Sequence, residues 1–235
     1  MPITDRQTDI LNKTIQEYIN SAQPISSQLL EKKYHFDICP ATIRTEMQML
    51  TEKGFLAQPH TSAGRIPTDK GYRFFVDELI KEGTFEKDFD FEIDDLIEKE
   101  TKDTFRFIQT LTKNLASLSS NLAMGYLADE KVLWKEGWEE VLEEPEFQEG
   151  ELISNFAKLL KNFEEGLGKL KINSEVKIYI GKENPFPKAK DFSIICAKCH
   201  FPNDEGVISL LGPKRMDYDK NIGLINSLVK LLEDF

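Results

Sequence analysis

The stretch that decides the fold runs from Pro59 to Asp77 and reads PHTSAGRIPTDKGYRFFVD. It opens with small polar residues and a glycine around one cation, Arg65, and short apolar segments flank it. Two short extended pieces joined by a glycine-containing loop predict a β-hairpin, here with a positively charged tip. Thr68 follows, and it can begin a helix because its hydroxyl accepts a hydrogen bond from the free N–H groups of a first turn.

A helix is predicted directly upstream, from Pro40 to Lys53. Proline is favoured at the first helical position, and Ile43, Met47 and Leu50 have the spacing of one buried face. The opposite face is small and polar and carries one arginine, which suits a DNA major groove, although a solvated helix face has the same composition. The hairpin behind it favours a winged helix-turn-helix, which is a DNA-reading fold. The side chains expected to read the groove are those of Ala41, Thr42, Arg44, Thr45 and Gln48.

The hairpin and the helix after it complete the predicted DNA interface. Hydroxyl groups of the loop are candidate phosphate donors, and Arg65 is the candidate for a phosphate or for the minor groove. The next helix, Thr68 to Lys81, directs two cations outward, and a nearby phosphate would explain a lysine in its first turn, where the helix dipole disfavours cations. A polar surface turn is the alternative. The expected wing residues are His60, Thr61, Ser62, Gly64 and Arg65, and the expected phosphate contacts are Lys70 and Arg73.

Charge is divided unevenly along the chain. The net charge of the 235 residues is −11, but residues 1–80 hold nine cations against ten carboxylates, so nearly all of the excess lies beyond them. An acidic segment is repelled by phosphate, which indicates two domains with different partners. We expect a DNA-binding domain over residues 1–81, completed by helices from Thr4 to Asn20 and from Ser26 to Tyr34, with Leu29 and Leu30 facing inward.

We expect neither a targeting signal nor a membrane span in this sequence. The N-terminus lacks the cationic start and apolar run of a signal peptide, and no segment has the apolar length that crosses a bilayer. Three cysteines do not form a disulfide framework in a chain of this size. We therefore expect a cytoplasmic protein without a membrane partner.

Residues 82–120 are expected to form a linker and a long helix, with an apolar stripe from Ile93 to Leu122. Such a stripe suits helix-to-helix dimerisation, and packing against the C-terminal domain is an equal alternative. Residues 121–235 alternate short apolar runs with helical patterns, which predicts an α+β domain with helices on one side of a sheet. The expected strands are Leu122–Leu127, Val132–Trp134, Val176–Ile180, Phe192–Lys198 and Gly206–Leu211, and the expected helices are Trp138–Leu142, Glu151–Leu167 and Asp219–Leu232.

No pattern of residues indicates catalysis. Cys196 and Cys199 have the CxxC spacing of a metal or redox pair, but they fall in a predicted strand, where side chains three positions apart point to opposite faces. We therefore expect one core and one surface cysteine, and neither a metal nor a cofactor. The three histidines are far apart in the sequence, and the chain is not expected to be an enzyme.

Several motifs resemble the family of the heat-inducible transcription repressor HrcA. In the N-terminal domain they are EYINSAQPISSQLL, ATIRTEMQMLTEKGFL and PHTSAGRIPTDKGYRFFVD, and in the C-terminal half they are VLEEPEF, YIGKENP and GVISLLGPKRMDY. The resemblance implies a homodimer that binds an inverted-repeat operator in double-stranded DNA and represses chaperone genes, with a GroE-type chaperonin as partner. It also implies a GAF-like C-terminal domain. The alternative function is a sensor or protein-interaction module whose C-terminal domain binds a ligand or a chaperone.

The chain departs from this family at several positions. Cys39 stands where the family commonly has serine before the recognition helix, and Thr45 stands where it commonly has asparagine. Cysteine is a poor N-cap, and threonine cannot make the bidentate adenine contact of asparagine, so the operator is expected to differ. The family's chains are also longer. Motif spacing places the missing segment between Ala123 and Val132, which predicts a reduced GAF-like domain, so the family's mode of dimerisation does not carry over to this chain.

Overall fold

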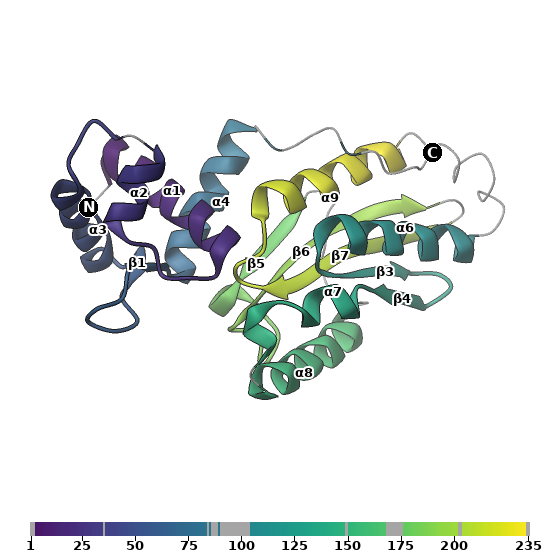
Figure 1. Cartoon of the computed structure of the whole chain (residues 1–235). Helices are drawn as coiled ribbons and strands as arrows, with labels where there is room; N and C mark the ends of the chain where they lie inside the picture. The colour runs from purple at the N-terminus through teal and green to yellow at the C-terminus, as the bar shows by residue number, and fades with distance from the viewer. Residues whose placement is uncertain are drawn as a thin grey trace. The chain divides into compact units, whose positions relative to one another are not determined.

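A computed structural model describes residues 3–34, 36–83, 85, 89, 104–148, 150–167, 176–201 and 204–233. Contacts between Cα atoms divide the chain into two compact units, Met1–Gly83 and Thr84–Phe235 (Figure 1). The first unit is mainly helical and the second combines helices with a larger sheet, so the fold belongs to the α+β class. Among the described residues, no helix is long and apolar enough to cross a membrane.

The first unit consists of helices around a short hairpin. Its described elements are α1 Asp5–Ser21, α2 Ser27–Tyr34, α3 Pro40–Glu52, β1 Leu56–Ala57, β2 Ile66–Pro67 and α4 Asp69–Glu82. α1 begins with a reciprocal cap, in which the Thr4 hydroxyl accepts from the Gln7 N–H and the Gln7 side chain accepts from the Thr4 N–H. α4 begins at Thr68 as predicted, since the Thr68 hydroxyl accepts from the N–H of Gly71 at 3.1 Å.

The helices of this unit share one core. The predicted face of α3 is buried, because Ile43, Met47 and Leu50 are each at most 2% exposed. Leu30 of α2 is fully buried, but Leu29 is 40% exposed, so the prediction that both leucines face inward is wrong. Consecutive side chains of a helix point about 100° apart. Because α2 is covered on one side only, Leu30 reaches the core and Leu29 remains exposed to solvent.

The second unit is built on a five-stranded antiparallel sheet with the strand order β4-β3-β7-β6-β5. Its described elements are α6 Thr104–Ser119, β3 Leu122–Leu127, β4 Val132–Glu136, α7 Trp138–Leu142, the 3-10 helix η1 Pro145–Gln148, α8 Gly150–Gly166, β5 Lys177–Ile180, the 3-10 helix η3 Gly181–Glu183, β6 Phe192–Phe201, β7 Asp204–Pro213 and α9 Tyr218–Glu233. Every strand and helix predicted in this part of the chain forms. The central strands β6 and β7 are longer than predicted and pair along their whole length.

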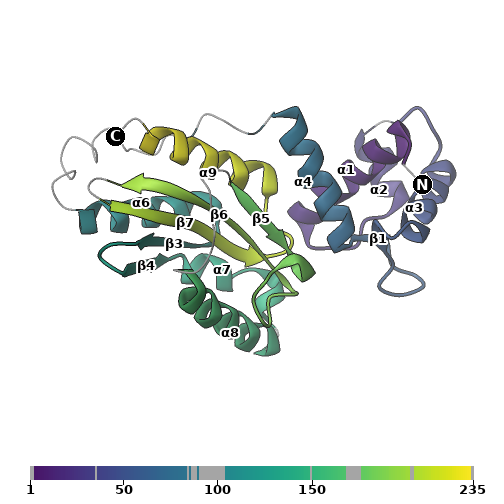
Figure 2. The ribbon, with the colours of Figure 1, turned by 180° about the vertical axis from the view of Figure 1, so that it is seen from behind.

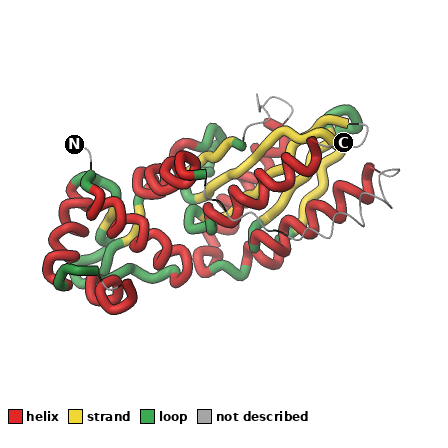
Figure 3. Tube along the Cα trace, turned by 90° about the horizontal axis from the view of Figure 1, so that it is seen from above, coloured by secondary structure: helices red, strands yellow, loops and turns green. Residues whose placement is uncertain are grey.

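Helices cover both faces of this sheet, which corrects the expectation of helices on one side (Figures 1 and 2). On one face, Phe156 and Phe163 of α8 pack with Phe192 of β6. On the other, Gly125 of β3 lies against Ile108 of α6. α9 packs on the same face, mainly against β6, and runs along the strands (Figure 3). A strand that is buried on both sides reads as a continuous apolar run, so its sequence does not reveal how helices are shared between the faces.

Cys196 and Cys199 point to opposite faces of β6, as predicted. Cys196 lies in the core beneath α8, whereas Cys199 lies on the other face, near Glu233 of α9. Both are buried, so the expectation of a surface cysteine is wrong, because helices cover the second face as well. Burial raises the pKa of each thiol to about 12.

The long helix predicted from Ile93 to Leu122 is described only as α6, and its earlier part lies outside the described residues. The apolar stripe of α6, including Phe107 and Leu111, is buried against the sheet. This described part therefore packs within its own unit, which is the second of the two alternatives. The helix ends before Ser120, whose φ of 53° leaves the helical region.

Candidate nucleic-acid interface

α3 presents the predicted polar face to solvent. Ala41, Arg44, Thr45 and Gln48 are exposed, and Thr42 is half-buried. The Thr45 hydroxyl donates to the carbonyl of Ala41 at 3.1 Å, so it is partly occupied within the helix. Arg44 has no hydrogen-bond or ion-pair partner in the described part of the chain. Its guanidinium is therefore the group on this face that is available to an external anion or base.

The start of α3 is weakly capped, as the sequence predicts. The N-cap is Cys39, whose side chain makes no capping hydrogen bond and instead lies with Sγ 3.3 Å from the Thr42 hydroxyl oxygen. That hydrogen bond lowers the pKa of the exposed Cys39 thiol. Pro40 occupies the first helical position, where its fixed φ favours the helix and its missing N–H removes one unsatisfied donor.

The loop of the hairpin is held from inside by one side chain. Gln58 donates through Nε2 to the carbonyl of Thr61 at 2.9 Å and to that of Ala63 at 3.0 Å. At the tip, Nδ1 of His60 lies 3.2 Å from Oγ of Ser62. Because His60, Thr61 and Ser62 are exposed, the tip offers polar groups to solvent while the base of the loop is fixed.

Ile25, in the connection between α1 and α2, forms an isolated antiparallel bridge with Arg65, the residue before β2. The Ile25 N–H donates to the Arg65 carbonyl at 2.9 Å, and the Arg65 N–H donates to the Ile25 carbonyl at 2.8 Å. Gly64 lies directly against this bridge, where an added Cβ would collide with the backbone of Ile25. The glycine therefore permits the close approach that joins the loop to the start of α2.

Arg65 does not project from the tip of the loop. It is only 9% exposed, and it donates from Nε to the Thr51 hydroxyl at 3.0 Å and from Nη2 to Oε1 of Gln48 at 2.9 Å. Burial, and after it the charge of Arg44, lowers the pKa of Arg65. The guanidinium thus joins the hairpin to α3, whereas the sequence alone places it on a phosphate or in the minor groove.

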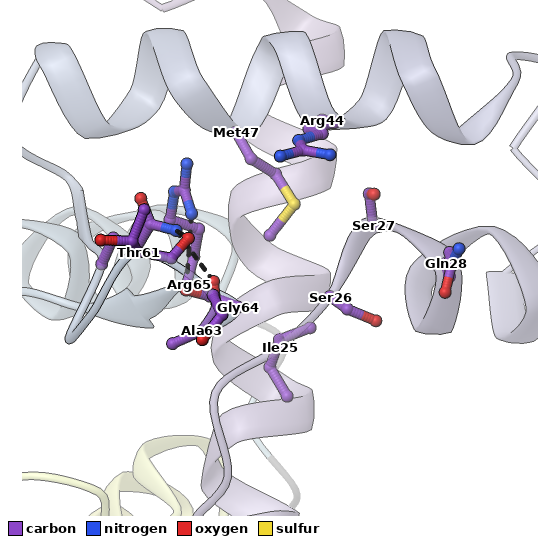
Figure 4. Close-up of a pocket in the computed structure, with 12 residues that line it drawn as sticks. Ile25, Ser26, Ser27, Gln28, Arg44, Met47, Thr61, Ala63, Gly64 and Arg65 are labelled. Atoms are coloured by element: carbon purple, nitrogen blue, oxygen red, sulfur yellow. Dashed lines mark hydrogen bonds between the residues drawn. The ribbon is translucent and has the colours of Figure 1, made fainter.

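A depression of about 270 Å³ lies between the hairpin loop, α3 and the start of α2 (Figure 4). Arg44 and Met47 of α3 line it together with the loop. Ile25 and the residues Ser26, Ser27 and Gln28 line it as well. The last three lie at the beginning of α2, where free backbone N–H groups favour an anion. The sequence predicts Ser26 only as the start of a helix, because nothing in the sequence shows that this helix start lies beside the hairpin.

The two cations predicted on α4 have partners within the first unit. Lys70 donates to the carbonyl of Lys53 at 2.7 Å, and its Nζ lies 4.2 Å from the centre of the Phe55 ring. A cation at the C-terminal end of α3 is favoured by the helix dipole, which explains Lys70 without a phosphate. Arg73 forms an ion pair with Asp77 at 3.4 Å on the surface of α4.

Comparison with known proteins places the chain in a family. Residues 75–222 match the family model described as HrcA protein C terminal domain. The chain belongs to the HrcA family. A relative from Natranaerobius thermophilus, named heat-inducible transcription repressor HrcA, is 30% identical over 332 positions that cover 99% of this chain and 96% of that protein. A relative of the same name from Desulfitobacterium hafniense is 42% identical over 122 positions, which cover 52% of this chain and 34% of that protein.

Chain length and fold were compared with a relative and with a solved structure. The alignment with the Natranaerobius relative extends over 332 positions, against 235 residues in this chain, so much of that relative has no counterpart here. The crystal structure of a hypothetical protein at 2.2 Å resolution shares the fold, with a TM-score of 0.82 at 21% identity over 99% of this chain and 98% of that one.

Proposed function

We propose that the chain is a heat-shock transcription repressor that binds DNA through a winged helix-turn-helix formed by its first unit. The name of its HrcA relatives supports repression as the function. The observation that carries the DNA interface is the exposed polar face of α3, with Arg44 directed outward beside the exposed hairpin tip. In this arrangement α3 is the recognition helix and the hairpin is the wing.

The residues have different tasks in the proposed complex. Arg44 reaches a guanine edge in the major groove or a phosphate beside it, and the start of α2 binds an adjacent phosphate. Arg65 positions the wing through its bonds to α3, and Gly64 permits the backbone bridge to Ile25. The remaining groove contacts are Ala41, Thr42, Thr45 and Gln48, the wing contacts are His60, Thr61 and Ser62, and Lys70 and Arg73 flank the interface.

Two copies of the chain are needed for an inverted-repeat operator. One described first unit has a single α3 and a single hairpin, which can occupy one half-site. We therefore infer a homodimer, with the DNA-binding domain over residues 1–81 and a GAF-like regulatory domain over residues 121–235. We also propose a chaperonin of the GroE type as the partner of the regulatory domain, as the resemblance of the sequence motifs implies, and no catalytic role is proposed.

A change at Arg44 tests the interface directly. The probe is a fluorescent duplex selected by the wild-type protein from a randomised pool, and anisotropy at about physiological salt measures its Kd. Arg44→Ala is expected to weaken binding by about 1–3 kcal/mol and to relax discrimination at one base pair, because it removes a base contact. Arg106→Ala is the matched control, since it removes an exposed arginine from α6 in the second unit.

The same measurement tests the function as a whole. A working repressor is expected to prefer the selected duplex over a scrambled one by at least roughly a thousandfold. Equal affinity for the two duplexes would contradict sequence-specific binding. If Arg44→Ala and Arg106→Ala lose the same affinity for the selected duplex, then Arg44 does not contact DNA.

A further inference from the structure

A second depression, of about 400 Å³, lies in the second unit beside the connection from β5 to β6. Lys182, Lys188 and Lys190 line it, against a single carboxylate from Glu151 of α8. This local excess of cations belongs to a chain whose net charge is −11, most of it beyond residue 80. A concave surface with one sign of charge concentrates ligands of the opposite sign.

Asn155 of α8 is an independent sign that the depression can hold a ligand. The residue is only 7% exposed, and it lines the depression. Its carboxamide has no hydrogen-bond partner among the side chains and backbone groups that the structure describes. The amide atoms are not fully enclosed, so water satisfies them in the free protein, and a molecule bound in the depression takes the place of that water.

The connection between β5 and β6 is already held in one shape. Asn184 donates through Nδ2 to the carbonyls of Gly181 at 2.9 Å, Ala189 at 3.3 Å and Phe192 at 2.9 Å. These bonds tie the two ends of the connection to its middle. A site that is ordered in advance loses little conformational freedom when it binds.

Phe186 gives the depression an apolar side. Its ring packs edge-on against Phe163 with 5.2 Å between the ring centres, and it lies close to Gly166 at the end of α8. These contacts fix the ring in place beside the lysines. An apolar wall with a few convergent polar groups is the usual composition of a small-molecule site, and the volume falls within the usual range.

We propose that this depression binds a small phosphorylated organic molecule. Lys188 and Lys190 contact the phosphoryl oxygens, because ammonium groups form charge-assisted hydrogen bonds with them. Asn155 bonds to a polar group of the ligand, and Phe186 packs against its organic part. Glu151 accepts from a ligand hydroxyl. All lining residues belong to the second unit, so ligand binding can be measured on the full chain without DNA.

Calorimetric titration of the full chain tests this proposal. The probes are ribose 5-phosphate and adenosine monophosphate, and ribose and adenosine serve as the unphosphorylated comparisons at matched ionic strength. At least one phosphorylated probe is expected to bind, and its unphosphorylated counterpart is not. Lys188→Gln combined with Lys190→Gln is expected to raise the Kd of that probe at least about tenfold, since two charge-assisted contacts are lost.

Two further variants separate the site from general charge. Asn155→Ala is expected to raise the Kd as well, although it removes no charge. Lys113→Gln combined with Lys230→Gln removes the same charge from exposed positions of α6 and α9, on the other face of the sheet, and is expected to leave the Kd unchanged. Failure of both phosphorylated probes to bind, or an equal loss in this control pair, would overturn the proposal.

Discussion

Arg65 illustrates how a local sequence and its three-dimensional surroundings assign different tasks to one residue. An arginine in a loop of small polar residues has the composition of a phosphate contact. The structure instead places acceptors from Gln48 and Thr51 around its guanidinium. These partners come from α3, and their distance from Arg65 in the sequence hides the contact. A buried charge is unfavourable unless it has hydrogen-bond partners. Because the partners of Arg65 belong to α3, the arginine links the hairpin to this helix.

This role predicts how DNA binding by an Arg65 variant depends on salt. Arg65→Met is expected to lower affinity for the selected duplex, because the wing is no longer fixed to α3. The slope of log Kd against log salt is expected to stay unchanged, because no phosphate contact is lost. Arg65→Lys keeps the charge but not the forked geometry, and we expect it to behave like Arg65→Met in affinity.

Anisotropy titrations at several salt concentrations provide the measurement. Arg44→Ala is the comparison variant, and a flatter slope there would identify its partner as a phosphate. If the slope of log Kd against log salt falls by about one in Arg65→Met, then Arg65 contacts a phosphate, which would contradict the positioning role.

Elements that follow a clear apolar spacing could be predicted from the sequence, and their mutual contacts could not. The spacing of Ile43, Met47 and Leu50 identifies the buried face of α3 and therefore its exposed face. The backbone bridge between Ile25 and Arg65 has no such signal, because its hydrogen bonds involve no side chain. For that reason the predicted site contained the helix face and the hairpin tip but not the start of α2.

The bridge between hairpin and α2 predicts a local effect of Gly64→Ala. The added Cβ would collide with the backbone of Ile25, so the bridge must open or shift. Amide hydrogen exchange at Ile25 and Arg65 is expected to accelerate by at least about tenfold, because these two N–H groups form the bridge. Gly150→Ala is the control, since no neighbour lies within 4 Å of its added Cβ and exchange at the bridge should not change. Unchanged exchange in Gly64→Ala would show that the loop adapts without this contact.

At the scale of the whole molecule, the chain joins a nearly neutral unit to an acidic one and lacks much of what its relatives carry. The sequence predicts a missing segment between Ala123 and Val132. In the structure these residues belong to the hairpin of β3 and β4, whose strands are joined by residues 128–131. α6 is buried against the sheet of its own unit. The proposed homodimer therefore does not use the apolar stripe of this described part of the predicted long helix.

A homodimer on an inverted repeat predicts a periodic dependence on half-site spacing. Inserting about 5 base pairs between the half-sites rotates them to opposite sides of the duplex and is expected to abolish most of the specific affinity. Inserting about 10 base pairs returns them to the same side, and part of the affinity should return. Anisotropy with the three duplexes makes the comparison. Affinity that is indifferent to spacing would mean that each chain binds alone.

The uneven burial of the three thiols makes the protein convenient for optical work. Cys39 is exposed at the first residue before α3, and its pKa is lowered by the Thr42 hydroxyl, whereas Cys196 and Cys199 are enclosed within the sheet unit. A maleimide dye reacts with the thiolate, so under native conditions it should attach at one position without any cysteine being engineered. The natural sequence thus provides a single reporter position at the end of the helix proposed to enter the groove, where docking would alter its emission.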